Sequence, residues 1–348
     1  MDRSHTFLAP DFYLDFSCKC GDCRRSCCEG WNVGISQQNY FKILGMECSE
    51  QLSQRLQRAF YIPRGATPER YALLNHDWQG NCPLRAENGM CALQLEMGED
   101  AIPDICRLYP RSVRGEYAEA CLSNSCERVV EMLMERERPI RFAEVELKEL
   151  ADDRELPSRL ALRMQCIGLM QDRRSTLAES LDSLGRLISG KTAETRPYPQ
   201  LLAVMRDFAE VYEEISVSVS SYCSRALDAL TDEAACREAD ARLAAKYPAL
   251  DLLLENLFVN HLFYEKFPFS ETKETEEEEY ISLCGMYGLL RFLLLGNEAE
   301  LTTDAALVDL LAACFRMMSH TRFYYNAHVL LKKAGMDDPA AAGALLAM

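Results

Sequence analysis

The first residues able to do chemistry are five cysteines near the start of the sequence. They lie within sixteen residues, Phe16 to Trp31, in the segment FSCKCGDCRRSCCEGW. Thiolates are soft ligands that select zinc or iron–sulfur clusters, whereas oxidised pairs would form disulfides. The segment therefore predicts a metal or iron–sulfur site, with disulfides as the alternative. These cysteines are Cys18, Cys20, Cys23, Cys27 and Cys28.

More cysteines follow beside turn-forming or polar residues, for example after Gly80-Asn81 and Asn88-Gly89. Turn residues let the chain bend tightly and expose backbone N–H groups, which helps a thiolate to reach a metal. A [4Fe-4S] cluster or a tetrahedral zinc ion needs four ligands. The five histidines are scattered, so an all-sulfur site is favoured, but the spacing does not choose between zinc and iron. The downstream cysteines are Cys82, Cys91, Cys106, Cys121 and Cys126.

The length and the chain start indicate a reducing compartment. A chain of 348 residues can bury a core without disulfides. The opening MDRSHTFLAPDFYL lacks the charged and apolar regions of a signal peptide. The apolar stretch Gly285 to Gly296 contains Arg291 and is too short to span a bilayer. We therefore expect a cytoplasmic protein that does not enter a membrane and keeps its thiols reduced.

The net charge of −16, from 38 basic and 54 acidic residues, argues against a nucleic-acid partner. It suits a basic or lysine-bearing partner, or simply a soluble acidic surface. The sequence contains neither GxGxxG nor GxxxxGK[ST], so a dinucleotide fold or a P-loop is unsupported.

The hydrophobic pattern predicts a mostly α protein in which a cysteine-rich metal- or cluster-binding region, 1–138, packs on a helical region, 158–348. Residues 139–157 are charged and weakly periodic, which favours a linker. Ser36 and Ser49 fit helix N-caps. Cys121 and Cys126 are expected at the entry to a helix that runs to about Arg138. Beyond the linker, apolar residues recur at helical spacing, and Thr275 fits a capping box.

The cysteine segment resembles the FSC-x4-C-x3-CC-x-GW signature of the flagellin lysine N-methylases. The resemblance continues in the order expected for that family and reaches the C-terminal half. The matching segments are CPL at 82–84, CRLYPR at 106–111, LSNSCE at 122–127, ENLFVNHLFYEKFPF at 255–269, YGLLRFLLLG at 287–296 and FRMMSHTRFYYN at 315–326.

The resemblance implies transfer of methyl groups from S-adenosylmethionine to lysine side chains of flagellin, together with a cysteine-ligated [4Fe-4S] cluster. Eight cysteines exceed the four ligands of one cluster, so some are structural or form a second site. Cys20 and Cys121 lie outside the family pattern, and Glu127 stands where the family usually has proline. The cysteines at family positions are Cys18, Cys23, Cys27, Cys28, Cys82, Cys91, Cys106 and Cys126.

The chemistry adds requirements of its own. A lysine ammonium must lose a proton before it can attack, and a carboxylate or tyrosine can take that proton. The cationic methyl donor needs acidic or aromatic surroundings. Tyr109, Tyr117, Glu116 and Trp31 are candidates, and no catalytic or S-adenosylmethionine-binding residue is assigned.

Two other functions remain open. The cysteines could form a structural zinc or iron site in a non-catalytic interaction protein, or Cys20-x2-Cys23 could act as a redox pair. Arg111 is expected to brace the cluster loop, Trp31 to pack in the core and His261 to be a satisfied core residue. Five later cysteines read as small buried hydrophobes: Cys166, Cys223, Cys236, Cys284 and Cys314.

Overall fold

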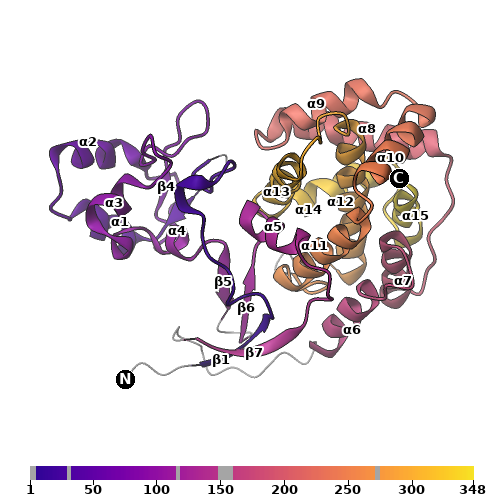
Figure 1. Cartoon of the computed structure of the whole chain (residues 1–348), viewed down its shortest axis with the longest axis horizontal. Helices are drawn as coiled ribbons and strands as arrows, with labels where there is room; N and C mark the ends of the chain where they lie inside the picture. Colours follow the sequence, from indigo (N-terminus) through magenta and orange to yellow (C-terminus); the bar gives the residue numbers. More distant parts are fainter. Residues whose placement is uncertain (1–4, 30–32, 115–117, 148–159, 271–274) are drawn as a thin grey trace.

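The structure is a computed structural model that describes residues 5–29, 33–114, 118–147, 160–270 and 275–348. It is mostly helical, as predicted. Figure 1 shows a small lobe formed by the N-terminal third and a larger helical half, joined through a sheet at the lower edge of the view. We use the names small lobe for residues 17–110 and helical half for residues 160–348.

The small lobe consists of short elements around a small apolar core. Ser36 and Ser49 cap the helices α1 and α2 through their side chains, as the sequence predicts. The buried side chains of Ile43, Leu52 and Leu93 meet in this core. The elements are η1 (Cys20–Asp22), β2 (Gly34–Ile35), α1 (Gln37–Leu44), α2 (Glu50–Ala59), β3 (Phe60–Tyr61), β4 (Ala72–Leu74), α3 (Ala92–Met97), η2 (Glu99–Ala101) and α4 (Asp104–Leu108), with strand order β2-β4-β3.

A four-stranded sheet, which the sequence analysis did not predict, joins the two parts. Its order is β5-β6-β1-β7, and β1 runs parallel to β6 and antiparallel to β7. The segment expected as a linker contains β7, whose residues are largely exposed and therefore give a weak hydrophobic pattern. The strands are β1 (His5–Pro10), β5 (Arg111–Arg114), β6 (Glu119–Leu122) and β7 (Phe142–Leu147).

Two local predictions next to this sheet are wrong. Cys121 lies within β6, where it pairs with Ser112, and not at a helix entry. Helix α5 (Glu127–Met134) begins directly after Cys126 and ends before Arg138. The β5–β6 hairpin takes up the chain that the prediction gave to the helix entry.

The helical half surrounds helix α12, which lies at the centre of its bundle in Figure 1. The predicted capping box is present, because Thr275 accepts the Glu278 N–H and Glu278 accepts the Thr275 N–H. This helix is long and apolar enough to cross a membrane by length and composition, but 89% of that stretch is buried inside the protein. It therefore packs as a core helix.

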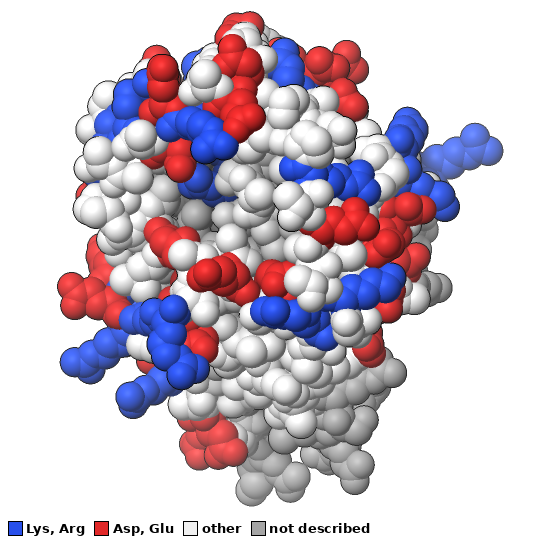
Figure 2. Space-filling view, turned by 90° about the vertical axis from the view of Figure 1, so that its right-hand side faces the viewer, with Lys and Arg blue, Asp and Glu red and all other residues white. Residues whose placement is uncertain are grey.

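The helices of this half are α6 (Leu160–Met170), α7 (Leu177–Ser189), α8 (Tyr198–Ile215), α9 (Ser220–Ala229), α10 (Glu233–Lys246), α11 (Leu250–Tyr264), α12 (Glu276–Gly296), α13 (Asp304–His320), α14 (Phe323–Lys333), α15 (Pro339–Gly343) and η4 (Ala344–Ala347). Figure 2 shows the face of this half that is turned away from the small lobe, where basic and acidic side chains are interspersed.

Buried asparagines on α11 attach the helical half to the chain around the sheet. Asn260 donates to the Leu122 carbonyl at 2.8 Å, and Asn256 donates to the Leu133 carbonyl at 3.2 Å. Asn124 donates in return to the Leu257 carbonyl at 2.7 Å. Because unmade hydrogen bonds at buried amides are costly, these contacts fix the position of α11 against β6 and α5.

Candidate functional site

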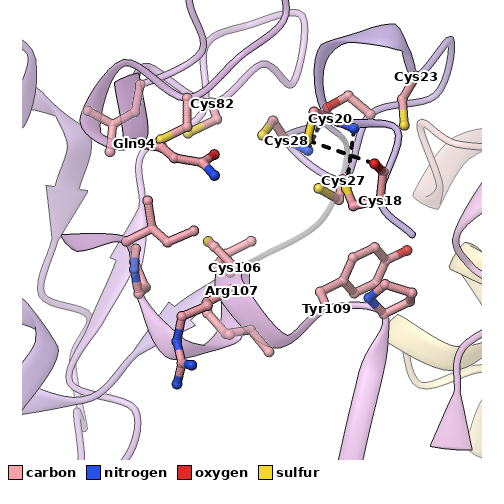
Figure 3. Close-up of a pocket in the computed structure, with 18 of the residues that line it drawn as sticks. Cys18, Cys20, Cys23, Cys27, Cys28, Cys82, Gln94, Cys106, Arg107 and Tyr109 are labelled. Atoms are coloured by element: carbon pink, nitrogen blue, oxygen red, sulfur yellow. Dashed lines mark hydrogen bonds between the residues drawn. The ribbon is translucent and has the colours of Figure 1, made fainter. Parts of the chain in front are cut away.

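A cavity of about 270 Å³ lies where the small lobe meets the helical half (Figure 3). All eight cysteines that the family resemblance singled out line it, together with Cys20. In Figure 3, Cys27 and Cys28 lie between Cys82 on one side and Cys23 on the other, with Cys106 below them. The fold thus gathers thiols from four separate segments around one cavity.

Two glycines allow the turns that carry these thiols to approach each other. A Cβ atom on Gly21 would lie 2.5 Å from the Asn88 carbonyl oxygen, and one on Gly89 would lie 2.6 Å from the Gly21 carbonyl oxygen. Gly89 also has a positive φ of 78°, which favours glycine. The turn that precedes Cys91 therefore packs backbone to backbone against the turn between Cys18 and Cys23.

The metal-free thiols in this cavity are held mostly in the protonated form. Burial raises the pKa of Cys23 and of Cys82 to about 12, and that of Cys126 to about 11. Backbone N–H groups that follow Cys82 and Cys126 act in the opposite direction. A metal bound here would have to displace these protons, so its binding would depend on pH.

Cys28 differs from its neighbours. A hydrogen bond from Cys27 lowers the pKa of Cys28, and a hydrogen bond from the Ser26 hydroxyl and the positive charges of Arg85 and Arg316 add to this effect. The same contact raises the pKa of Cys27. Cys28 is therefore the thiol in the cavity that most readily becomes a thiolate.

The donor atoms around the cavity are sulfurs, which suit a metal centre by their chemistry but are not placed around a single point. No disulfide joins the sixteen cysteines, all of which are described. Within the described ranges, no three His, Cys, Asp or Glu side chains converge closely enough to hold a single metal ion. The thiols instead ring a cavity, and soft sulfur ligands suit zinc or iron–sulfur clusters.

Arg316, on α13 of the helical half, binds the loop that carries Cys27 and Cys28. Its guanidinium is buried and donates to four backbone carbonyls at 3.0 to 3.2 Å, those of Arg25, Ser26, Glu29 and Ser125. These carbonyls flank Cys27, Cys28 and Cys126. The sequence analysis missed this residue; an arginine inside the apolar stretch CFRMM was the available signal.

Glu127 connects the same loop to α5. Its buried carboxylate accepts the Arg25 backbone N–H at 2.6 Å and pairs with the Lys19 ammonium at 2.6 Å. Arg24 extends the network to Asp309 on α13 at 2.9 Å. Glu127 thus fixes the loop between Cys18 and Cys27 against the start of α5.

A chain of hydrogen-bonding side chains leads from the cavity wall into the helical half. The Tyr109 hydroxyl lies 2.9 Å from the Ser125 hydroxyl, which lies 2.8 Å from Nε2 of His320. Burial raises the pKa of Tyr109 well above its usual value and lowers the pKa of His320 to about 4. At neutral pH both groups are therefore uncharged, and Tyr109 is a poor proton acceptor.

The remaining predicted residues have mixed outcomes. Arg111 donates to the Phe16 carbonyl at 2.8 Å and stacks on the Phe16 ring, so it braces the chain as expected, although it forms no ion pair with the residues that the structure describes. His261 is buried and bonded to the Tyr324 hydroxyl at 2.7 Å. The five later cysteines are buried. Trp31, Glu116 and Tyr117 lie outside the described residues.

Comparison with known proteins gives one match to a protein family and several to individual proteins. Residues 192–345 match a family described as the FliB lysine N-methylase C-terminal domain. Lysine-N-methylases of Salmonella choleraesuis and Salmonella typhimurium are 24% identical over 131 residues. A flagellar biosynthetic protein FliU of Salmonella muenchen has the same identity over the same length.

These alignments cover 33% of this chain. They span 30% of each lysine-N-methylase and 72% of FliU. No solved structure matches the chain.

Proposed function

We propose, from the match of residues 192–345 to the FliB lysine N-methylase C-terminal domain family, that the protein is an S-adenosylmethionine-dependent methyltransferase. Its proposed substrates are lysine side chains of flagellin, and its proposed cofactor is a cysteine-ligated [4Fe-4S] cluster. The family match is the observation that carries the proposal. We expect a cytoplasmic enzyme, where thiols remain reduced and newly made flagellin is accessible.

The thiol cavity supports a site between the two parts of the molecule. The helical half, which contains the matched region, contributes Arg316 to the cavity wall. Three of its four carbonyl contacts join that region to the cysteine loop, and the fourth reaches Ser125, which precedes Cys126. The matched region is thus in direct contact with the loop that carries the cysteines, which supports a shared role for the two.

The ligands of the proposed cluster come from the eight thiols around the cavity. If such a cluster were bound here with one iron lacking a protein ligand, it would offer the amino and carboxylate groups of S-adenosylmethionine a place to bind. The chain itself positions the thiols through Arg316 and Glu127 and shields the cavity with Tyr109. Neutral Tyr109 can face the cationic methyl donor with its ring but cannot serve as the tyrosinate base.

The direct test is methyl transfer with protein purified without oxygen. Purified flagellin and labelled S-adenosylmethionine are incubated with the protein, and methylated lysines are identified by mass spectrometry. We expect label on flagellin lysines and none on a flagellin whose lysines have been chemically methylated beforehand. Absence of transfer by protein that contains iron and sulfide would contradict the proposal.

The small lobe favours one alternative, a structural metal site in a non-catalytic protein. Four of the thiols lie at the edge of its apolar core, where a metal would reinforce a small fold. Stoichiometric zinc, no sulfide and no methyl transfer would support this alternative.

A further inference from the structure

We infer that a second cavity, in the helical half, binds a ligand that carries an ammonium group on an alkyl stem. This helical cavity has a volume of about 330 Å³ and lies between the start of α7, helix α10, the start of α11 and helix α12. Figure 1 shows α7 and α10 on the side of the helical half that is turned away from the small lobe. Among the residues that the structure describes, the helical cavity shares no lining residue with the cysteine cavity. The inference therefore goes beyond the proposed function and does not depend on it.

The buried part of the cavity wall contains a phenol that has no hydrogen bond. Tyr287, on α12, lines the helical cavity and is only 6% exposed. Its ring packs edge-to-face against Phe258 at 6.1 Å between centroids. Its hydroxyl forms no hydrogen bond with any residue that the structure describes. Because buried polar groups normally have a partner, this hydroxyl is available to a ligand.

Two exposed carboxylates and one guanidinium also line the helical cavity. Arg291 donates to Asp240 at 2.5 Å, so these two charges largely balance each other. Asp251 accepts the Leu177 N–H through Oδ2 at 3.2 Å. Within the described part of the chain, its other carboxylate oxygen accepts no hydrogen bond. The cavity therefore has an excess of negative charge, and Asp251 is the group that remains to pair with a cation.

The charged groups act on the same buried hydroxyl. Burial raises the pKa of Tyr287, the charge of Arg291 opposes this effect, and the charges of Asp251 and Asp240 add to it. Tyr287 is therefore a neutral phenol at neutral pH, and its oxygen can accept a hydrogen bond. An ammonium group beside this oxygen would donate to it and would be attracted by Asp251.

The rest of the wall suits an alkyl stem. Tyr247 lines the helical cavity, and its hydroxyl already lies 3.0 Å from the carbonyl oxygens of Leu301 and Thr303, so its ring is what it offers to a ligand. Aromatic rings attract cations, and the stem of a lysine side chain packs well on apolar surface. The buried apolar lining residues are Leu243, Leu250 and Leu254.

An alkylammonium such as a lysine side chain matches this wall better than other ligand classes. An anion would meet the excess negative charge, and a neutral apolar ligand would leave Asp251 and the Tyr287 hydroxyl without a partner. Only a cation with an apolar stem uses the carboxylate, the phenol oxygen and the leucines together.

The test is a calorimetric titration of the full-length protein with two probes that differ in one group. Nα-acetyl-lysine amide carries the ammonium, and Nα-acetyl-norleucine amide has the same stem without the charge. We expect saturable binding of the lysine probe and roughly tenfold weaker binding of the norleucine probe, because a hydrogen bond to a charged group is lost.

Two conservative variants assign the binding to the helical cavity. Tyr287→Phe keeps the ring that packs against Phe258, and Asp251→Asn keeps an oxygen that can accept the Leu177 N–H. Each should weaken binding of the lysine probe roughly fivefold and leave that of the norleucine probe unchanged. Circular dichroism verifies that both variants keep the helix content of the unmodified protein.

Tyr325→Phe and Asp228→Asn are the matched controls. Both residues are exposed and lie outside the helical cavity, so these variants should bind the lysine probe as the unmodified protein does. Absence of saturable binding, or equal binding of the two probes, would overturn the inference. Unchanged binding of the lysine probe in both Tyr287→Phe and Asp251→Asn would also overturn it, because the probe would then bind elsewhere.

A competition experiment identifies the source of the ammonium group. If flagellin displaces the lysine probe and flagellin with acetylated lysines does not, the ligand is a lysine side chain of a protein. If neither displaces it, the ligand is a free amine. Methyl transfer is assayed separately. Binding without transfer would refute the proposed function alone, whereas transfer without binding in the helical cavity would refute this inference alone.

Discussion

The small lobe and the helical half reach a folded state by different means. The helical half has one continuous apolar core around α12, a helix of 21 residues. The longest helix in the small lobe is α2, with 10 residues, and the fully buried side chains of its core are few. Short elements around a small core bury little apolar area for the entropy lost on ordering. The comparison predicts that the helical half holds itself together, whereas a metal bound by the thiols of the lobe would supply a large share of the stability of the lobe.

The largest expected effect is that of metal removal. If the thiols bind metal, chelation should cost the lobe on the order of 10 kcal/mol, the range of structural zinc sites. Hydrogen exchange should then rise in α1 to α4 while α11 and α12 keep their protection. An equal rise of hydrogen exchange in both parts would show that the stability of the lobe depends on metal no more than that of the helical half.

Shortening a buried core side chain should have the next largest effect, and its effect on metal content should differ between the two parts. Leu93→Ala in the lobe and Phe292→Ala in α12 remove fully buried side chains, so each should cost about 3 to 4 kcal/mol. Only Leu93→Ala should also lower the amount of metal retained, because Leu93 packs in the core that contains Cys82 and contacts Cys91. Denaturant titration and metal analysis measure the two outcomes.

Arg316 should have a somewhat smaller effect on stability and a specific effect at the junction. Arg316→Met leaves four carbonyls without their donor and should cost about 3 kcal/mol. Arg316→Lys should recover part of the metal loading, because an ammonium can reach some of these carbonyls. Arg242→Met, at an exposed arginine, is the control. If folded Arg316→Met bound as much metal as the unmodified protein, Arg316 would have no role in positioning the thiols.

Acid should weaken the helical half through His261. Burial lowers the pKa of His261 to about 3 in the folded protein, so its contribution is fully present above the ordinary pKa of 6.5 and is lost as the pH falls. Between pH 7 and pH 5 the loss from this group should be about 2 kcal/mol. His261→Gln should flatten that part of the stability curve measured by denaturant titration. An unchanged pH slope would indicate that His261 is accessible to protons in the folded state.

Local signals predicted much of the helical half and little of what joins it to the lobe. Thr275 caps α12 in the helical half, as Ser36 caps α1 in the lobe, because capping depends on residues within one turn. The sheet was missed because β1 pairs with β6 and β7, which lie far away in sequence, and because β7 is short and largely exposed. Such pairing has no local signature.

At the candidate site, too, the sequence predicted some residues, and only the fold shows the importance of others. The family resemblance selected eight cysteines, and all of them line one cavity. Their roles as ligands stay a prediction. Cys20 also lines the cavity, although it lies outside the family pattern. Arg316 and Glu127 could not be predicted, since their importance comes from carbonyls and N–H groups that only the fold brings to them.

The order of strands in the sheet has a consequence for synthesis on the ribosome. Leu8 of β1 pairs with Glu119 of β6, so the whole lobe emerges while β1 still lacks both of its partners. Chains tend to fold from the N-terminus as they emerge. The thiols of the lobe are therefore exposed to solvent before α5 and α13 arrive to cover them, so a metal would reach them most easily at that stage.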